Sequence, residues 1–195
     1  MRKSLIAFVL TVCLLCFTAC STTSPEDGTA TQNTTDTTVT TTTTTAPFTP
    51  MYSAKDYFET LEFYDDTTGQ TIEYLFHEPM RHSNEPVPLV IYLHCLGDTV
   101  TATHLGTATS IVHSLMAFEN RSAEYSTYTL VPSTPSSLQG NWTYPQVTAF
   151  KTLLRDVIDR YNIDTNRIYL SGLSMGGFMT CQLVSEMPGT FAAAV

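Results

Sequence analysis

Residues 167–178 read RIYLSGLSMGGF, a short apolar strand that runs into Gly-x-Ser-x-Gly and then into a helix. The two backbones come close at such a turn, so the neighbours of the serine must be small, and Gly172 and Gly176 meet that need. The turn places Ser174 at a helix N-terminus, where N–H groups and the dipole favour negative charge. The strand and the helix argue against a chance match. The stretch predicts the nucleophile elbow of a serine hydrolase, with Ser174 as nucleophile and the Met175 N–H as an oxyanion donor.

Apolar patterning before and after this turn indicates alternating strands and helices. Strands at 57–63 and 72–76 enclose a turn at 65–69, which predicts a hairpin. Residues 89–93 are nearly all apolar, as in a strand buried on both faces. The other expected elements are a helix near 111–118, a strand at 128–131 that Pro132 stops, a helix over 147–161, a helix from 178 and half a strand at 191–195. This order predicts an α/β fold, with a mostly parallel sheet and an N-terminal hairpin.

The N-terminus has the pattern of an exported protein. Arg2 and Lys3 precede an apolar run that is too short for a confident membrane span, and small residues follow it, which predicts a signal peptide over 1–19. Residues 17–20, FTAC, resemble the lipobox of bacterial lipoproteins. That resemblance implies a lipid on Cys20, a membrane contact through this anchor, and a location at the cell surface. An ordinary signal peptide of a secreted protein, or an uncleaved anchor, stays open.

A threonine-rich segment separates this leader from the rest of the chain. Residues 20–50 contain almost no large apolar side chains, so they cannot bury enough surface to offset their ordering entropy. We expect a disordered linker that acts as a spacer. The folded domain is expected to cover residues 51–195.

Charge and motifs exclude several classes of partner. The formal net charge is −9, and no basic run is visible, so nucleic acid is not an expected partner. His94, Cys95 and Asp98 lack the spacing of common zinc sites, and no phosphate-binding loop is present. We therefore expect neither a metal nor a cofactor. Cys95 and Cys181 could pair or remain free.

The segment 164–177, DTNRIYLSGLSMGG, closely matches a pattern found in one group of enzymes. It resembles the α/β-hydrolase superfamily, and within it secreted bacterial esterases of the polyhydroxybutyrate depolymerase, feruloyl esterase and "predicted peptidase" type. The resemblance covers roughly residues 55–195. These proteins carry a His-Gly-x-Gly loop after a buried strand, and here the loop reads HCLG at 94–97.

The resemblance implies roles for individual residues. The Leu96 N–H would be the second oxyanion donor, and His94 would shape the loop and not act as the base. Asp164 and Arg167 would tie the helix end to the elbow strand. The family usually has glycine where this chain has Cys95, a position at which a positive φ would cost strain.

In this superfamily the acid and the histidine of the triad follow the serine. All five histidines of this chain precede Ser174, and Glu186 lies on a helix that is wrong for the acid. We therefore expect a sheet that is incomplete at the C-terminus, and residues 1–195 alone to be inactive. The favoured function is a surface-tethered or secreted serine hydrolase that cleaves small or polymeric carboxylic esters. A serine peptidase of the same fold, a triad with an upstream histidine, and a non-catalytic truncated relative remain open.

Overall fold

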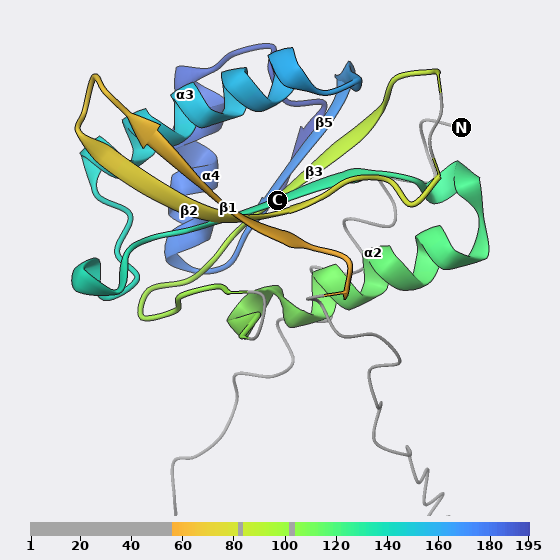
Figure 1. The fold of residues 1–195 in the computed structure, drawn as a ribbon. Helices are drawn as coiled ribbons and strands as arrows, with labels where there is room; N and C mark the ends of the chain where they lie inside the picture. Colours follow the sequence, from red (N-terminus) through yellow and green to blue (C-terminus); the bar gives the residue numbers. More distant parts are fainter. Residues whose placement is uncertain (1–55, 82–83, 102–103) are drawn as a thin grey trace, which may run out of the picture.

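The computed structural model of the protein describes residues 56–81, 84–101 and 104–195. The predicted signal peptide, the linker and Cys20 lie outside these ranges. The described residues form one six-stranded sheet in the order β1-β2-β4-β3-β5-β6 (Figure 1). Its strands are β1 (Glu59–Asp65), β2 (Gln70–His77), β3 (Val87–Leu93), β4 (Tyr128–Ser133), β5 (Ile163–Gly172) and β6 (Ala193–Ala194). The α-helices are α2 (Thr109–Arg121), α3 (Tyr144–Arg160) and α4 (Met175–Glu186).

The sheet is parallel over β4, β3, β5 and β6, and antiparallel where β1 and β2 join it. The β1–β2 turn depends on Gly69, whose φ of +67° favours glycine. Its N–H donates to Asp65 O at 2.8 Å. The predicted fold class, a mostly parallel sheet with an N-terminal hairpin, is therefore confirmed.

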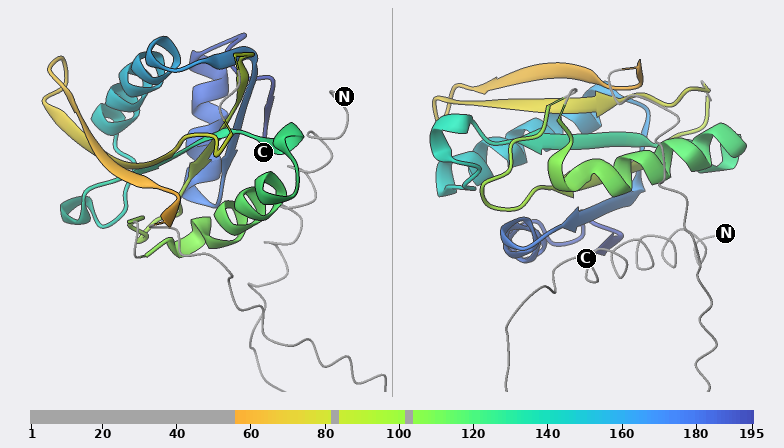
Figure 2. Two further views of the ribbon diagram at one scale, coloured as in Figure 1. Left: turned by 45° about the vertical axis from the view of Figure 1, so that its right-hand side comes forward. Right: turned by 90° about the horizontal axis from the view of Figure 1, so that it is seen from below.

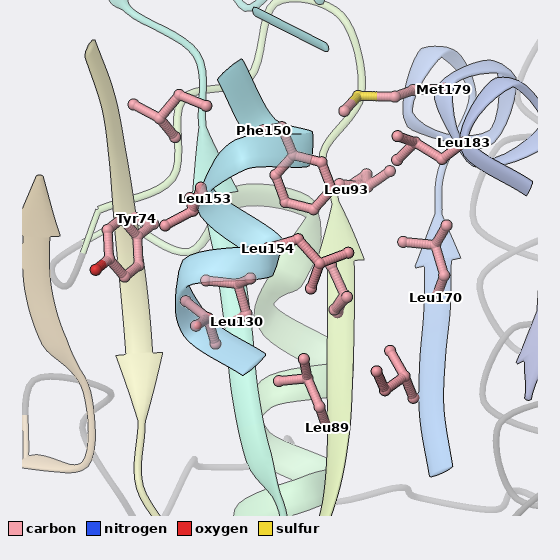
Figure 3. Packing of buried hydrophobic residues seen from close by; sticks show 14 of the residues in the cluster. Tyr74, Leu89, Leu93, Leu130, Phe150, Leu153, Leu154, Leu170, Met179 and Leu183 are labelled. Carbon is pink, nitrogen blue, oxygen red and sulfur yellow. The ribbon is translucent and has the colours of Figure 1, made fainter. Parts of the chain in front are cut away.

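Helices cover both faces of the sheet. Helices α3 and α4 pack on one face, and α2 packs on the other, as Figures 1 and 2 show. The apolar face of α3 places Phe150, Leu153 and Leu154 against Leu130 of β4 and Leu170 of β5 (Figure 3). All five side chains are fully buried. This burial is the main force that holds the layers together.

Strand β4 is longer than expected, since it continues through Pro132 to Ser133. Tyr128 to Leu130 pair with β3, whereas Pro132 and Ser133 pair only with β2. A proline is tolerated there, since it lies beyond the end of the pairing with β3. The expectation that Pro132 stops the strand was wrong for this reason.

Asp164 and Arg167 connect β5 to the start of β3. The expectation that they tie the end of a helix to the elbow strand was therefore wrong. The Arg167 Nε donates to Asp164 Oδ2 at 2.5 Å, and its Nη2 donates to Pro86 O at 2.7 Å, just before β3. The hydrogen bond from Arg167 lowers the pKa of the Asp164 carboxyl. The pair therefore fixes the entrance of β5 against that of β3, at the end of the sheet opposite to Ser174.

Candidate active site

Ser174 occupies a strained turn between β5 and α4. Its φ of +53° and ψ of −112° lie outside the regions that non-glycine residues prefer. Such strain persists only where the surrounding structure imposes it, and it is concentrated at functional sites. Ser174 is exposed, and α4 begins at the next residue. The strand, the sharp turn and the helix are the context that the Gly-x-Ser-x-Gly pattern requires.

The two glycines of the motif leave no room for a side chain. A Cβ on Gly176 would lie 2.1 Å from Leu93 O, at the end of β3. A Cβ on Gly172 would lie 2.3 Å from Gly176 O. Both contacts are with backbone atoms, which cannot move away as the tip of a side chain can. The strand, the turn and the helix are therefore packed backbone against backbone at this point.

The first turn of α4 leaves the Met175 N–H group available beside the serine. Gly176 donates to Leu173 O at 2.9 Å, and Phe178 donates to Ser174 O at 3.1 Å. Met175 is the first helical residue, so its N–H has no partner within the helix. No residue in the described ranges accepts a hydrogen bond from it. The Met175 N–H can therefore serve as a donor to an oxyanion.

The loop after β3 forms a tight turn at the same edge of the sheet. Asp98 N–H donates to Cys95 O at 3.3 Å, and Gly97 has a φ of +81°. Leu96, the second residue of this turn, is 59% exposed, and its N–H has no partner among the described residues. Leu173 N–H donates to Leu93 O at 3.2 Å, which holds the elbow against the end of β3. Both predicted oxyanion donors thus come from the carboxyl ends of neighbouring strands.

Cys95 does not adopt the backbone conformation that would have caused strain. The residue of the turn that needs a positive φ is Gly97, and Cys95 is not among the residues with positive φ. Cysteine therefore costs no left-handed strain at this position. Cys95 and Cys181 are both free thiols, and Cys181 is exposed.

His94 is a structural residue in this geometry. It is fully buried, its Nδ1 donates to Cys95 O at 2.9 Å, and its Nε2 accepts from Thr134 N–H at 3.1 Å. A carbonyl only accepts and a backbone N–H only donates, so the ring is neutral, with its proton on Nδ1. The indole of Trp142 packs against the ring and donates to His94 O at 3.2 Å. No nitrogen remains for general-base catalysis.

We expect His94 to stay neutral to a lower pH than an ordinary histidine does. Burial lowers the pKa of His94 below 6.5. It outweighs the hydrogen bond to Cys95 and the negative charge of Asp98, which both raise the pKa. The unfolded chain then takes up this proton at a higher pH than the native protein, so the free energy of unfolding should fall as the pH drops below about 6.5. An NMR titration of the imidazole should give a midpoint below that value. A midpoint at or above it would contradict the burial argument.

A second strained residue supports the same loop. Gln139 has a φ of +53° and a ψ of +39°, the left-handed conformation, and its carbonyl accepts from Gly97 N–H at 3.0 Å. Gly140 follows, and a Cβ there would lie 2.5 Å from Asp98 O. The segment 136–142 is thus fitted closely to the turn after β3.

Gln139→Gly is expected to stabilise the protein. Glycine adopts the left-handed conformation without the penalty that glutamine pays, which should add about 1 kcal/mol and roughly 3 °C to the melting temperature. Asparagine should give a smaller gain, and the β-branched Gln139→Val should be worse than the native residue. Thermal unfolding of the three variants tests this order, and a destabilised glycine variant would refute it.

His77, His104 and His113, the other histidines that the structure describes, belong to other segments of the fold than the Ser174 turn. His77 is buried, its Nδ1 contacts Tyr57 O at 2.8 Å, and its Nε2 contacts Glu119 Oε2 at 2.7 Å. His113 belongs to α2, on the face of the sheet opposite to α4. His104 is exposed and lies near Asp98, and His82 is outside the described residues.

The one acidic residue after Ser174 is occupied elsewhere. Glu186 lies at the far end of α4, and its Oε2 accepts from Lys151 Nζ at 2.6 Å. Hydrogen bonds from Lys151 and Gln182 lower its pKa. Glu186 is therefore paired with the Lys151 ammonium group of α3.

Sequence reasoning did not assign a role to Asp98, Thr134 or Gln139. Each acts through contacts with segments that are distant in the chain, so no local pattern reveals it.

Over residues 56–81, 84–101 and 104–195, no three His, Cys, Asp or Glu side chains gather into a metal-binding group. In the same ranges, every helix is too short or too polar to span a bilayer.

Comparisons with known proteins agree with this geometry. The model of the prolyl oligopeptidase family matches residues 136–195. A thermostable esterase of known structure is 32% identical, with a TM-score of 0.60 over 72% of this chain and 40% of that chain. A search of curated proteins found no match.

Two more distant structures share the fold. S-formylglutathione hydrolase from Staphylococcus aureus is 17% identical, with a TM-score of 0.51 over 71% of this chain and 57% of that chain. A ferulic acid esterase is 18% identical, with a TM-score of 0.56 over 70% of this chain and 58% of that chain. The chain therefore spans less than two thirds of the length of all three.

The strand order, the helices on both faces and the strained serine turn are those of the α/β-hydrolase fold. The fold that the resemblance of the sequence predicted is therefore confirmed, and the matches to the prolyl oligopeptidase family and to a thermostable esterase agree with it. Within it, the chain is similar to serine hydrolases of the esterase type.

Proposed function

We propose that the protein is a serine hydrolase that cleaves carboxylic esters, with Ser174 as its nucleophile. The observation that carries this proposal is the exposed serine at φ +53° and ψ −112°, held between β5 and α4. Gly172 and Gly176 leave the room that this turn requires, and the turn presents Ser174 at a helix N-terminus. The similarity to a thermostable esterase supports ester hydrolysis over other chemistry of the fold.

The site residues have separate roles in the proposed reaction. The Ser174 hydroxyl attacks the ester carbonyl, and the Met175 and Leu96 N–H groups stabilise the negative oxygen of the tetrahedral intermediate. The alcohol leaves as the acyl-enzyme forms, and water then releases the acid. The histidine that takes the serine proton, and the acid that orients it, come in this proposal from outside residues 1–195. The occupied His77 and His94 support that assignment.

The proposed location is the outer surface of a bacterial cell. A lipid on Cys20 and the threonine-rich segment 20–50 would hold the domain at a distance from the membrane. The substrate would then be a small or polymeric ester outside the cell. This part of the proposal rests on the sequence pattern alone.

A peptidase is the second candidate. It is favoured by the match of residues 136–195 to the prolyl oligopeptidase family. The elbow and the oxyanion donors serve ester and amide substrates alike, so they do not separate the two.

Turnover of matched substrates tests the proposal. The protein from its complete reading frame should hydrolyse p-nitrophenyl acetate, and hydrolyse a prolyl p-nitroanilide far more slowly. Comparable or faster cleavage of the anilide would favour the peptidase. Absence of activity on both substrates would favour a non-catalytic relative.

A further inference from the structure

Asp98 is a buried carboxylate next to the predicted oxyanion site. It ends the Cys95–Asp98 turn and is 9% exposed. Its Oδ2 accepts from both donors of one residue, Thr107 N–H at 2.7 Å and Thr107 Oγ1 at 2.8 Å. Its Oδ1 lies against Gly106, where a Cβ would be only 2.0 Å away, and 3.6 Å from His104 Nε2. The carboxylate thus joins the turn to the segment that leads into α2.

The backbone of Asp98 is held from a second direction. Its N–H closes the turn onto Cys95 O at 3.3 Å. A Cβ on Gly140 would lie 2.5 Å from Asp98 O and 2.7 Å from Asp98 N, so the segment around Gly140 contacts the peptide directly. The last residue of the turn is therefore fixed both by its side chain and by its main chain.

We propose that Asp98 is a positioning residue for the oxyanion hole. Leu96 lies in the middle of the turn whose end Asp98 anchors, so the direction of the Leu96 N–H depends on that anchor. The inference deepens the proposed function and rests on it. Asp98 does not touch the substrate; it acts through the position of the Leu96 N–H.

The expected kinetic effect follows from when the oxyanion forms. The negative oxygen exists in the tetrahedral intermediate and not in the bound ester, so a displaced donor weakens only the later state. Loss of one donor typically lowers kcat by about 100- to 1000-fold. A displaced donor should cost less, so we expect Asp98→Ala to lower kcat roughly 10- to 100-fold, with KM changed less than about 2-fold.

The chain contains a matched control for the loss of a buried carboxylate. Asp65 is 2% exposed, and its Oδ2 also accepts from the N–H and the Oγ1 of one threonine, Thr68, at 3.2 and 2.5 Å. It is the last residue of β1, next to the turn into β2, and β1 is the edge strand on the far side of the sheet from β5. Asp65→Ala removes the same kind of hydrogen bonds without a link to Leu96, so its folded fraction should keep the native kcat.

Two further variants separate anchoring from general destabilisation. Asp98→Asn keeps an oxygen that can accept from both Thr107 donors, so it should restore most of the kcat that alanine loses. Thr107→Val removes only the hydroxyl donor and should give an intermediate kcat. Because it retains the backbone hydrogen bond, this variant tests the anchor even if Asp98→Ala fails to fold.

The experiment measures kcat and KM for p-nitrophenyl acetate in these variants of the complete protein, with Ser174→Ala as the blank. Hydrogen exchange at the Gly97 amide, which donates to Gln139 O, is measured alongside and should be faster in Asp98→Ala. A native kcat in Asp98→Ala and Thr107→Val, or an equal loss in Asp65→Ala, would overturn the proposal while leaving the hydrolase intact. Wild-type turnover that does not depend on Ser174 would overturn the proposed function and this inference together.

Discussion

Ser174→Ala is expected to lower ester hydrolysis by the complete protein by a factor on the order of 10⁴ or more. In the proposed mechanism, alanine removes the oxygen atom that forms the acyl-enzyme, while the proposed oxyanion donors, the Met175 and Leu96 N–H groups, remain. The fold should persist, because the Ser174 side chain makes no helix-capping hydrogen bond. Initial rates with p-nitrophenyl acetate, together with circular dichroism, measure both effects.

Ser174→Gly makes the same prediction sharper. Glycine adopts a positive φ freely, so this variant should be as inactive as alanine and yet more stable than the native protein, by about 1 kcal/mol. Ser185→Ala, on the exposed side of α4, is the control and should change neither property. Activity that survives in both Ser174 variants would remove Ser174 from the mechanism.

Gly176→Ala is expected to destabilise the protein by about 3 kcal/mol, which is the upper part of the usual range for overpacking. The new Cβ would lie 2.1 Å from Leu93 O, and relief requires α4 to move away from β3. Such a movement also displaces the Met175 N–H, so kcat should fall with stability. Urea unfolding monitored by circular dichroism measures the loss in the free energy of unfolding.

Gly177→Ala is the matched control on the same helix. Its Cβ would approach Gly172 O at 3.3 Å, a tight contact that a small shift can relieve. The higher helix propensity of alanine, about 0.8–1 kcal/mol, offsets this contact. Stability should therefore stay near the native value. Equal losses in the two variants would show that the close approach at Gly176 does not govern the turn.

The sequence predicted the fold where the signals are local. The alternation of apolar strands and amphipathic helices, the hairpin turn at Gly69 and the elbow at Ser174 all depend on short stretches of chain. Pro132 misled the prediction, because its effect depends on which neighbouring strand pairs at that point. The pairing of β4 between β2 and β3 is a property of the whole sheet and has no local signal.

The candidate site, like the fold, could be predicted from the sequence only where its signals are local. The serine and its glycines follow from a motif, whereas the supports of the second loop come from segments at 106–107 and 134–142. Asp98 and Gln139 act through these long-range contacts, and neither stands out in the sequence. The strain at Gln139 in particular becomes visible only when its carbonyl is seen to accept from Gly97.

The central claim is that the strained turn presents Ser174 as an activated nucleophile. The most direct measurement is labelling of the complete protein with a fluorophosphonate, followed by mass spectrometry of the peptide that spans the elbow. We predict one adduct for each protein molecule, located on Ser174 and absent after heat unfolding. A folded protein that takes up no label, or an adduct on another residue, would contradict the claim.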